Sequence, residues 1–122
     1  MGKKEEIDNI LKELNQSSPS IKASLLARVD GLVIHSRLME GVDGRSLAAM
    51  TATIVGTAQT ISKELEQGKL NQVIVESENG KLVSINAGKL AILSCLVDPN
   101  ANLGFVLLEM GKAAKKLEEI LE

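Results

Sequence analysis

Apolar residues recur along the chain with two different periods, and the changes of period mark the predicted elements. Over residues 3–16 apolar side chains recur every three or four positions among charged ones, which is typical of an amphipathic helix. The same spacing predicts a second helix that Asp43 or Ser46 caps and Gly68 ends, because glycine favours the left-handed position after a helix. It predicts a third helix that begins after Asn102.

Five further segments have the alternating or continuous apolar pattern of strands. Asp30-Gly31 and Asn79-Gly80 are strong signals for the tight turns of two hairpins. The last strand is nearly all apolar, so we expect both of its faces to be covered and its place to be central. The predicted strands are residues 21–29, 32–37, 71–77, 81–87 and 89–97.

The order α-β-β-α-β-β-β-α with short connections predicts an α+β domain built on a five-stranded antiparallel sheet. The strand at 89–97 has a free side, and the strand at 21–29 is its simplest partner. This pairing leaves the strands at 32–36 and 71–77 as the two edges. Both faces of the sheet need cover, so we expect the long middle helix on one face and the two terminal helices on the other.

The middle helix contains a stretch, residues 46–62, without one charged side chain, although one quarter of the chain is charged. Helical geometry puts its large apolar side chains on one stripe, which we expect to face the sheet. This stripe consists of Leu47, Met50, Ile54, Ala58, Ile61 and Leu65. The stretch is short for a membrane span and is diluted by Ser, Thr and Gln, so we expect no membrane insertion.

The other side of this helix carries small, uncharged residues where a solvent-facing helix normally carries Lys and Glu. A second helix that approaches closely would explain this composition, and the simplest partner is a second copy of the chain. The alternatives are a helix buried within its own chain and an open face of small residues. The predicted homodimer interface on this helix is Ala48, Ala49, Ala52, Val55, Gly56, Gln59 and Thr60.

The edge strand at 71–77 fits the same interpretation. Its centre, Val73-Ile74-Val75, contains neither Pro nor Lys, and an unguarded apolar edge favours the addition of another strand. We therefore expect these three residues to pair with the second copy. The alternative is a short edge that Glu76 and Glu78 protect.

Composition and charge narrow the class of partner. The 122 residues fit one domain over 1–122, and its core must be aliphatic because Phe105 is the only aromatic residue. The net charge of −2 disfavours nucleic acid as a partner, because a basic surface supplies most of that affinity. Cys95 is the only cysteine, so no disulfide within the chain and no zinc pair is expected, which favours a cytoplasmic location.

Few side chains suggest catalysis or ligand binding. His35 is expected to be a partly exposed strand residue, and Cys95 a small buried hydrophobic side chain. The loop that contains Gly41 and Gly44 lacks the Lys and Ser or Thr of a phosphate-binding loop. We therefore predict a non-enzymatic protein with no catalytic residue, no cofactor and no metal. Of its three arginines, Arg45 is the best placed to insert into a partner's site.

An ordered set of short segments covers nearly the whole chain and resembles the Roadblock family, the group of the Roadblock dynein light chains and MglB. The segments are LLARVDGLVIHS at 25–36, the helix that begins SLAAM at 46, LNQVIVESENGKLVSINAGKLAILSCLVD at 70–98 and ANLGFVLLEMGKAAKKL at 101–117. No single motif is diagnostic. The resemblance implies a profilin-like αββαβββα domain and a homodimer joined through the middle helix and the third strand.

The resemblance also implies a function. The stand-alone prokaryotic form is similar to MglB, a dimer that binds a small Ras-like GTPase and stimulates it, and Arg45 and Lys63 are the candidate GTPase contacts here. The alternative is a structural adaptor subunit of a larger complex without a GTPase. A third reading, a small-molecule sensor, is disfavoured by the lack of aromatic residues and of a convergent polar pocket in the sequence.

Overall fold

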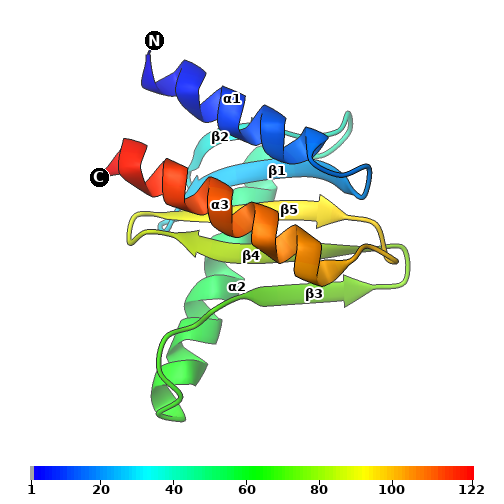
Figure 1. Ribbon diagram of the computed structural model, residues 1–122. Helices are drawn as coiled ribbons and strands as arrows, with labels where there is room; N and C mark the ends of the chain where they lie inside the picture. Colours follow the sequence, from blue (N-terminus) through cyan, green and yellow to red (C-terminus); the bar gives the residue numbers. More distant parts are fainter. Residues whose placement is uncertain (1) are drawn as a thin grey trace.

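The computed structural model describes residues 2–122, and these form the predicted order of helices and strands in three layers (Figure 1). The elements are α1 (Lys3–Gln16), β1 (Ile21–Arg28), β2 (Val33–Arg37), α2 (Gly44–Glu64), β3 (Val73–Ser77), β4 (Gly80–Ala87), β5 (Ala91–Val97) and α3 (Leu103–Leu121).

The five strands form one antiparallel sheet in the order β2-β1-β5-β4-β3. Leu25 on β1 and Ser84 on β4 both lie opposite Ser94, which confirms β5 as the central strand. The prediction that β2 and β3 form the two edges is also confirmed.

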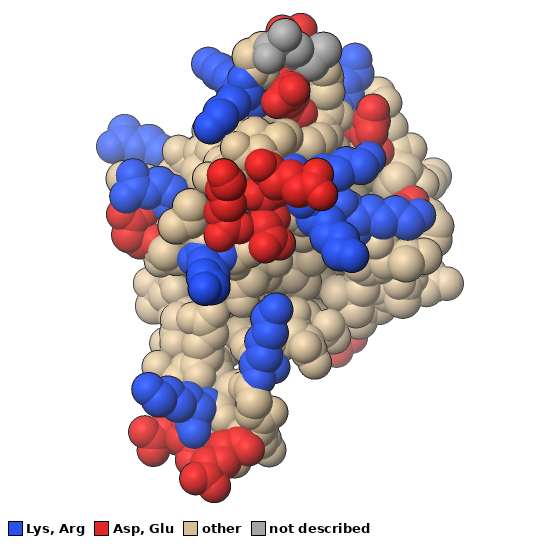
Figure 2. Space-filling view, turned by 60° about the vertical axis from the view of Figure 1, so that its left-hand side comes forward, with Lys and Arg blue, Asp and Glu red and all other residues tan. Residues whose placement is uncertain are grey.

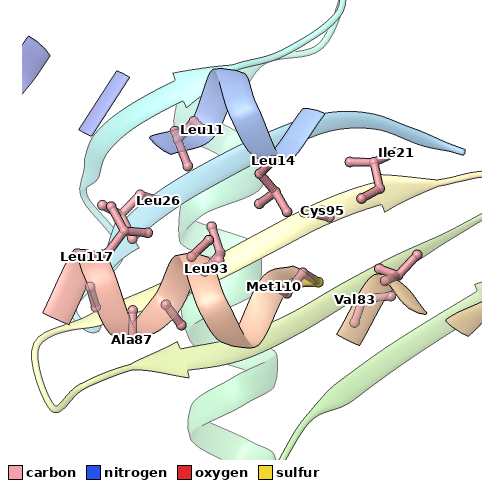
Figure 3. Close-up of a cluster of buried hydrophobic side chains, with 14 of the residues drawn as sticks. Leu11, Leu14, Ile21, Leu26, Val83, Ala87, Leu93, Cys95, Met110 and Leu117 are labelled. Atoms are coloured by element: carbon pink, nitrogen blue, oxygen red, sulfur yellow. The ribbon is translucent and has the colours of Figure 1, made fainter. Parts of the chain in front are cut away.

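The helices cover both faces of the sheet as expected. Figure 1 shows α1 and α3 side by side in front of the sheet and α2 crossing behind it. The larger apolar core lies between the sheet and the terminal helices, where Leu11, Leu26, Leu93, Met110 and Leu117 are fully buried (Figure 3). On the other face the core is smaller, and the C-terminal half of α2 extends past the β3 edge of the sheet (Figure 1).

Side-chain caps start two of the helices where the sequence predicts them. The Asp43 carboxylate accepts hydrogen bonds from the backbone N–H groups of Arg45 (3.0 Å) and Ser46 (3.3 Å) at the start of α2. The Asn102 side chain accepts one from the N–H of Phe105 (3.1 Å) at the start of α3. Each cap satisfies donors that the helix itself leaves without a partner.

The predicted end of α2 is wrong by several residues. The helix ends at Glu64, and Glu66 takes the left-handed conformation (φ 53°) that we expected after the helix at Gly68. The N–H of Glu66 bonds to the carbonyl of Lys63 and the N–H of Gln67 to that of Ser62, so the last turn closes before the glycine.

The second hairpin turn is displaced by one residue from its prediction. Ser77 lies opposite Gly80, so the turn residues are Glu78 and Asn79, and Gly80 is the first residue of β4. A Cβ atom at Gly80 would lie 3.3 Å from the Val97 carbonyl oxygen. The glycine therefore allows the close approach of β5 rather than the turn itself.

The face that α2 turns towards the sheet is also different from our prediction. Ala48, Thr51 and Val55 are its buried residues, whereas four members of the expected sheet-facing stripe are exposed. These four are Met50 (59% exposed), Ile54 (37%), Ile61 (53%) and Leu65 (61%). The remaining two, Leu47 and Ala58, are half-buried.

Close packing explains why small residues of α2 face the sheet. The turn between β1 and β2 comes so near to the helix that a Cβ atom on Gly31 would lie 3.4 Å from the Cα of Ala49. Ala48 and Leu25 pack together in the small core on this side, with Ala27 of the same strand. Long side chains such as Met50 would hold the helix farther from the sheet, so they lie outside this contact.

Candidate protein-docking surface

The exposed side of α2 is a continuous uncharged surface, which we call the docking arc. Figure 2 shows charged side chains over the upper part of the molecule and at the tip of the lower lobe, with isolated basic side chains and otherwise uncharged surface between them. Arg45 and Lys63 lie near the two ends of α2, about 27 Å apart at 1.5 Å per residue. The arc consists of Ala49, Met50, Thr53, Ile54, Gly56, Thr57, Thr60, Ile61 and Leu65, all exposed.

The docking arc is less polar than its threonine content suggests, because the threonine hydroxyls form hydrogen bonds within the helix. Thr53 donates its hydroxyl to the carbonyl of Ala49 (3.0 Å), Thr57 to that of Thr53 (2.9 Å) and Thr60 to that of Gly56 (3.1 Å). Because these hydroxyls already have partners within the helix, covering them with another protein leaves no donor without an acceptor. The arc is therefore suited to a close and nearly dry contact.

Glycine adds a hollow to the arc. A Cβ atom at Gly56 would meet nothing within 4 Å. Glycine in a helix interior costs about 1 kcal/mol relative to alanine, and nothing inside the protomer accounts for that cost here. The position is thus free to admit a close-packed partner.

The sheet continues the apolar surface beside the helix. Along β3, β4 and β5, Val75, Leu82 and Leu96 lie opposite one another. Their neighbours Val83 and Cys95 belong to the core under the terminal helices, so this row points to the α2 side. Val75 is 38% exposed, and Leu82 and Leu96 are only half-buried.

The structure separates the predicted interface residues of α2 into three groups. Ala48 and Val55 are buried against the sheet, at 0% and 2% exposure, so they have no surface to offer to a partner and the prediction is wrong for them. Ala52 is half-buried, and the amide of Gln59 lies 3.5 Å from the side-chain oxygen of Asn86. The other three, Ala49, Gly56 and Thr60, lie on the docking arc.

The three predicted interface residues of β3 do not share a face. Ile74 packs against the core under the terminal helices. Val73 and Val75 point to the α2 side, because successive side chains of a strand alternate. Only the outer backbone edge of β3 is common to all three, so a pairing with another strand would use that edge.

The two candidate GTPase contacts stay apart in the protomer, at opposite ends of α2. Arg28 pairs with Asp30 (2.6 Å) and Arg37 with Asp8 (2.8 Å), whereas the Arg45 side chain has no ion pair within residues 2–122. Arg45 is therefore the one arginine of the described chain whose guanidinium is available to a partner.

His35 and Cys95 are structural residues, as expected. The Asp8 carboxylate links α1 to β2: it lies 2.8 Å from Nε2 of His35 and accepts two hydrogen bonds from Arg37, of 2.8 and 2.9 Å. The bonds from Arg37, and then that from His35, hold the pKa of Asp8 well below its usual range. Burial raises the pKa of the Cys95 thiol to about 12, so it stays a neutral apolar side chain.

Within residues 2–122 no cluster of His, Cys, Asp and Glu side chains has the arrangement of a metal site. Over the same residues, no helix combines the length and the apolar character that crossing a bilayer requires.

The described chain is a three-layer domain that exposes an uncharged helix on one face. The Roadblock/LC7 domain model matches residues 6–97, so the chain belongs to the Roadblock/LC7 family. Its relatives include the uncharacterized protein MJ1340 of Methanocaldococcus jannaschii, 38% identical over 92% of this chain and 96% of that protein.

Solved structures show the same fold. Myxococcus xanthus MglB matches with a TM-score of 0.88 at 24% identity, over 95% of this chain and 94% of its own. A structure of MglB with a tetrameric arrangement matches with a TM-score of 0.87 at 23% identity, over 98% and 90%. Acanthamoeba castellanii profilin II, at 13% identity, matches with a TM-score of 0.65 over 91% and 95%, so the fold is profilin-like.

Proposed function

We propose that this chain is a non-enzymatic homodimeric platform that binds and regulates a small Ras-like GTPase. The observation that carries the proposal is the docking arc, with Met50, Ile61 and Leu65 more than half exposed on a helix that extends past its own sheet. Monomeric proteins rarely expose an apolar surface of this kind without a partner.

A second copy of the chain is the simplest partner for this surface. A two-fold axis near the middle of α2 would bring the arcs of two copies together in antiparallel orientation, because each surface then meets itself. Gly56 would let the two backbones approach, and Ile54 and Ile61 would fill the space on either side of the contact. The row of Val75, Leu82 and Leu96 would supply further apolar area beside the helices.

The β3 edges of the two copies would lie near each other in the same arrangement. The outer edge of β3 has no partner strand in the sheet. Pairing between two β3 strands would join the sheets and would protect the edge from other chains.

The GTPase would bind across the surface formed by both copies. Arg45 of one copy would then lie near the C-terminal end of the other copy's α2, so that the contact surface exists only in the dimer. In this arrangement Arg45 and Lys63, which are far apart in one protomer, would contribute to a single surface. The chain would regulate the GTPase by holding its switch loops or by inserting Arg45 into its site. Neither of these requires an acid–base pair on this chain.

Light scattering after gel filtration tests the dimer. We expect twice the 13.0 kDa mass of the chain at micromolar concentration. Ile61→Glu would place a charge in the contact and shift the species towards the monomer, whereas Leu108→Glu, at a position of α3 with similar exposure (57%), would leave the mass unchanged. A monodisperse monomer of the wild-type chain would overturn the proposal.

Binding and turnover measurements test the GTPase. Purified small Ras-like GTPases from the same genome would be loaded with GDP or with a non-hydrolysable GTP analogue and titrated with the chain. We expect binding in one nucleotide state and its loss in Ile61→Glu. If the chain binds the GTPase without changing the rate of GTP hydrolysis, the proposed platform function stands and the proposed regulation of turnover does not. Absence of binding to every such GTPase would favour the structural adaptor.

A further inference from the structure

A cleft with both polar and apolar lining residues lies beside the C-terminal part of α2. It has a volume of about 970 Å³, which is at the upper end of the range for ligand sites. Its walls come from the α2–β3 connection, the end of β4 with the β4–β5 turn, and the α3 residues from Leu107 to Glu118, and Gln59 of α2 also lines it. These segments are far apart in the sequence and lie together at the left of Figure 1.

Each of the three walls contributes one lysine. These are Lys69 of the connection, Lys89 of the turn and Lys115 of α3. None of the three has an ion pair or a side-chain hydrogen bond among the residues that the structure describes, although other lysines pair with nearby acids, such as Lys22 with Asp98 and Lys81 with Glu76. Figure 2 brings this side forward and shows isolated basic side chains between the acidic group above and the charged tip below.

The remaining lining is suited to an anion. Asn71, Gln72 and Asn86 add amide groups that can donate hydrogen bonds. Glu118 is the only acidic residue of the lining, and the Glu122 side chain lies against Gly88 at its edge. The lining thus carries a net charge of +2 on a chain whose overall charge is −2. Such a concentration of positive charge attracts anions to the cleft.

Glycine keeps the cleft open on the α3 side. A Cβ atom at Gly111 would meet nothing within 4 Å, and the same holds at Gly68 in the connection. Leucine or lysine at position 111 would be compatible with the helix and would partly fill the space. The fold therefore has room for a side chain at this position, and the glycine leaves that part of the cleft open.

We propose that this cleft binds a small phosphorylated anion with at least two linked phosphate groups. A compact anion with charge on several sides can contact lysines on three separate walls at once. An extended acidic peptide would instead need lysines arranged in a row. Lysine ammonium groups bind phosphate as point charges, and the amides would complete the contacts. The lining contains no aromatic residue, so the phosphates and not a nucleobase would be recognised. This proposal does not depend on the GTPase or on the dimer.

The test is a titration of the full chain with inorganic pyrophosphate at low ionic strength, followed by ¹H–¹⁵N correlation spectra. We expect shifts at the amides of Gly68, Gly88 and Gly111, which line the cleft and are dispersed over its three walls. The affinity should fall as salt is added, because the contacts are exposed charges.

Variants assign the effect to the cleft. Lys69→Gln, Lys89→Gln and Lys115→Gln should each weaken binding by up to about fivefold, the upper end of the range for exposed charge pairs. Lys12→Gln, at an exposed position of α1 outside the cleft, should leave it unchanged. Gly111→Leu should weaken binding because it partly fills the space, and Gly56→Leu, the same change at an equally open helix position, should not.

Three outcomes would overturn the proposal. The first is the absence of shifts at millimolar pyrophosphate. The second is a set of shifts at surface lysines in general, which Lys12→Gln changes as much as Lys115→Gln does. The third is tighter binding of a hexaglutamate peptide at the same residues, which would make the cleft a site for an acidic protein segment.

Discussion

At the scale of single residues, Asp8 is the acidic group on which the contact between α1 and β2 depends. Its carboxylate holds both His35 and Arg37, and its pKa is held well below the value of an unfolded chain, about 3.9. Ionisation of Asp8 therefore favours the folded state above that pH, and the benefit is lost as the pH falls and the unfolded chain binds the proton.

We expect Asp8→Asn to lower the melting temperature at pH 7 and to have a smaller effect at pH 3, where the unfolded chain already binds the proton but the folded Asp8 carboxylate is still ionised. Glu13→Gln, at an exposed position of the same helix without an ion pair, is the control and should change little at either pH. Calorimetry at the two pH values measures both. An equal loss at pH 7 and pH 3 would mean that packing, and not charge, makes the contribution of Asp8.

Two buried serines on adjacent strands allow a second test at this scale. Ser84 and Ser94 are 2% and 1% exposed, and their hydroxyl oxygens lie 2.7 Å apart. Removing one hydroxyl leaves the other buried without this partner, so Ser84→Ala and Ser94→Ala should each cost about 1–2 kcal/mol of unfolding free energy. The double variant should cost no more than either single one, as urea unfolding would show. Additive losses would mean that each hydroxyl has a separate role.

At the scale of elements, α2 shows where sequence patterns succeed and where they fail. The element order, the strand order, both edges and the caps Asp43 and Asn102 were predictable, because they depend on local periodicity and on capping chemistry. The orientation of α2 was not, because the periodicity finds an apolar stripe without saying what covers it. Here the closeness of the Gly31 turn selects Ala48 and Thr51 for the sheet.

The corrected orientation changes the prediction for Gly56. The position lies on the docking arc in open space, so leucine fits the protomer and stabilises the isolated helix by its higher propensity. In a close-packed dimer the same side chain would collide with the other copy. We expect Gly56→Leu to keep or raise the melting temperature of the monomer and to weaken dimerisation at least tenfold, as sedimentation velocity would measure.

Gly111→Leu is the matched control for this change. Gly111 is also a glycine in an open helix position, and it lies outside the docking arc. It should leave the dimer intact. If both variants dimerise equally well, the helix contact lies elsewhere than at Gly56.

At the scale of the whole molecule, the candidate sites were only partly predictable. The docking arc was found from its lack of charge, since solvent-facing helices normally carry Lys and Glu, although four of its nine residues were placed on the wrong side. The cleft was not found, because Lys69, Lys89 and Lys115 lie on three segments that only the fold brings together. A convergent site of this kind leaves no spacing signature in the sequence.

The dimer also makes a prediction for the stability of the whole molecule. If two folded copies associate and unfolded chains do not, mass action makes the melting temperature depend on protein concentration. For a chain of this length a tenfold increase in concentration should raise it by about 3 °C, from the typical unfolding entropy per residue. Ile61→Glu should melt at a temperature independent of concentration, since each protomer has its own core between the sheet and the terminal helices. A wild-type melting temperature that is equally independent would show that the exposed side of α2 stays uncovered in solution.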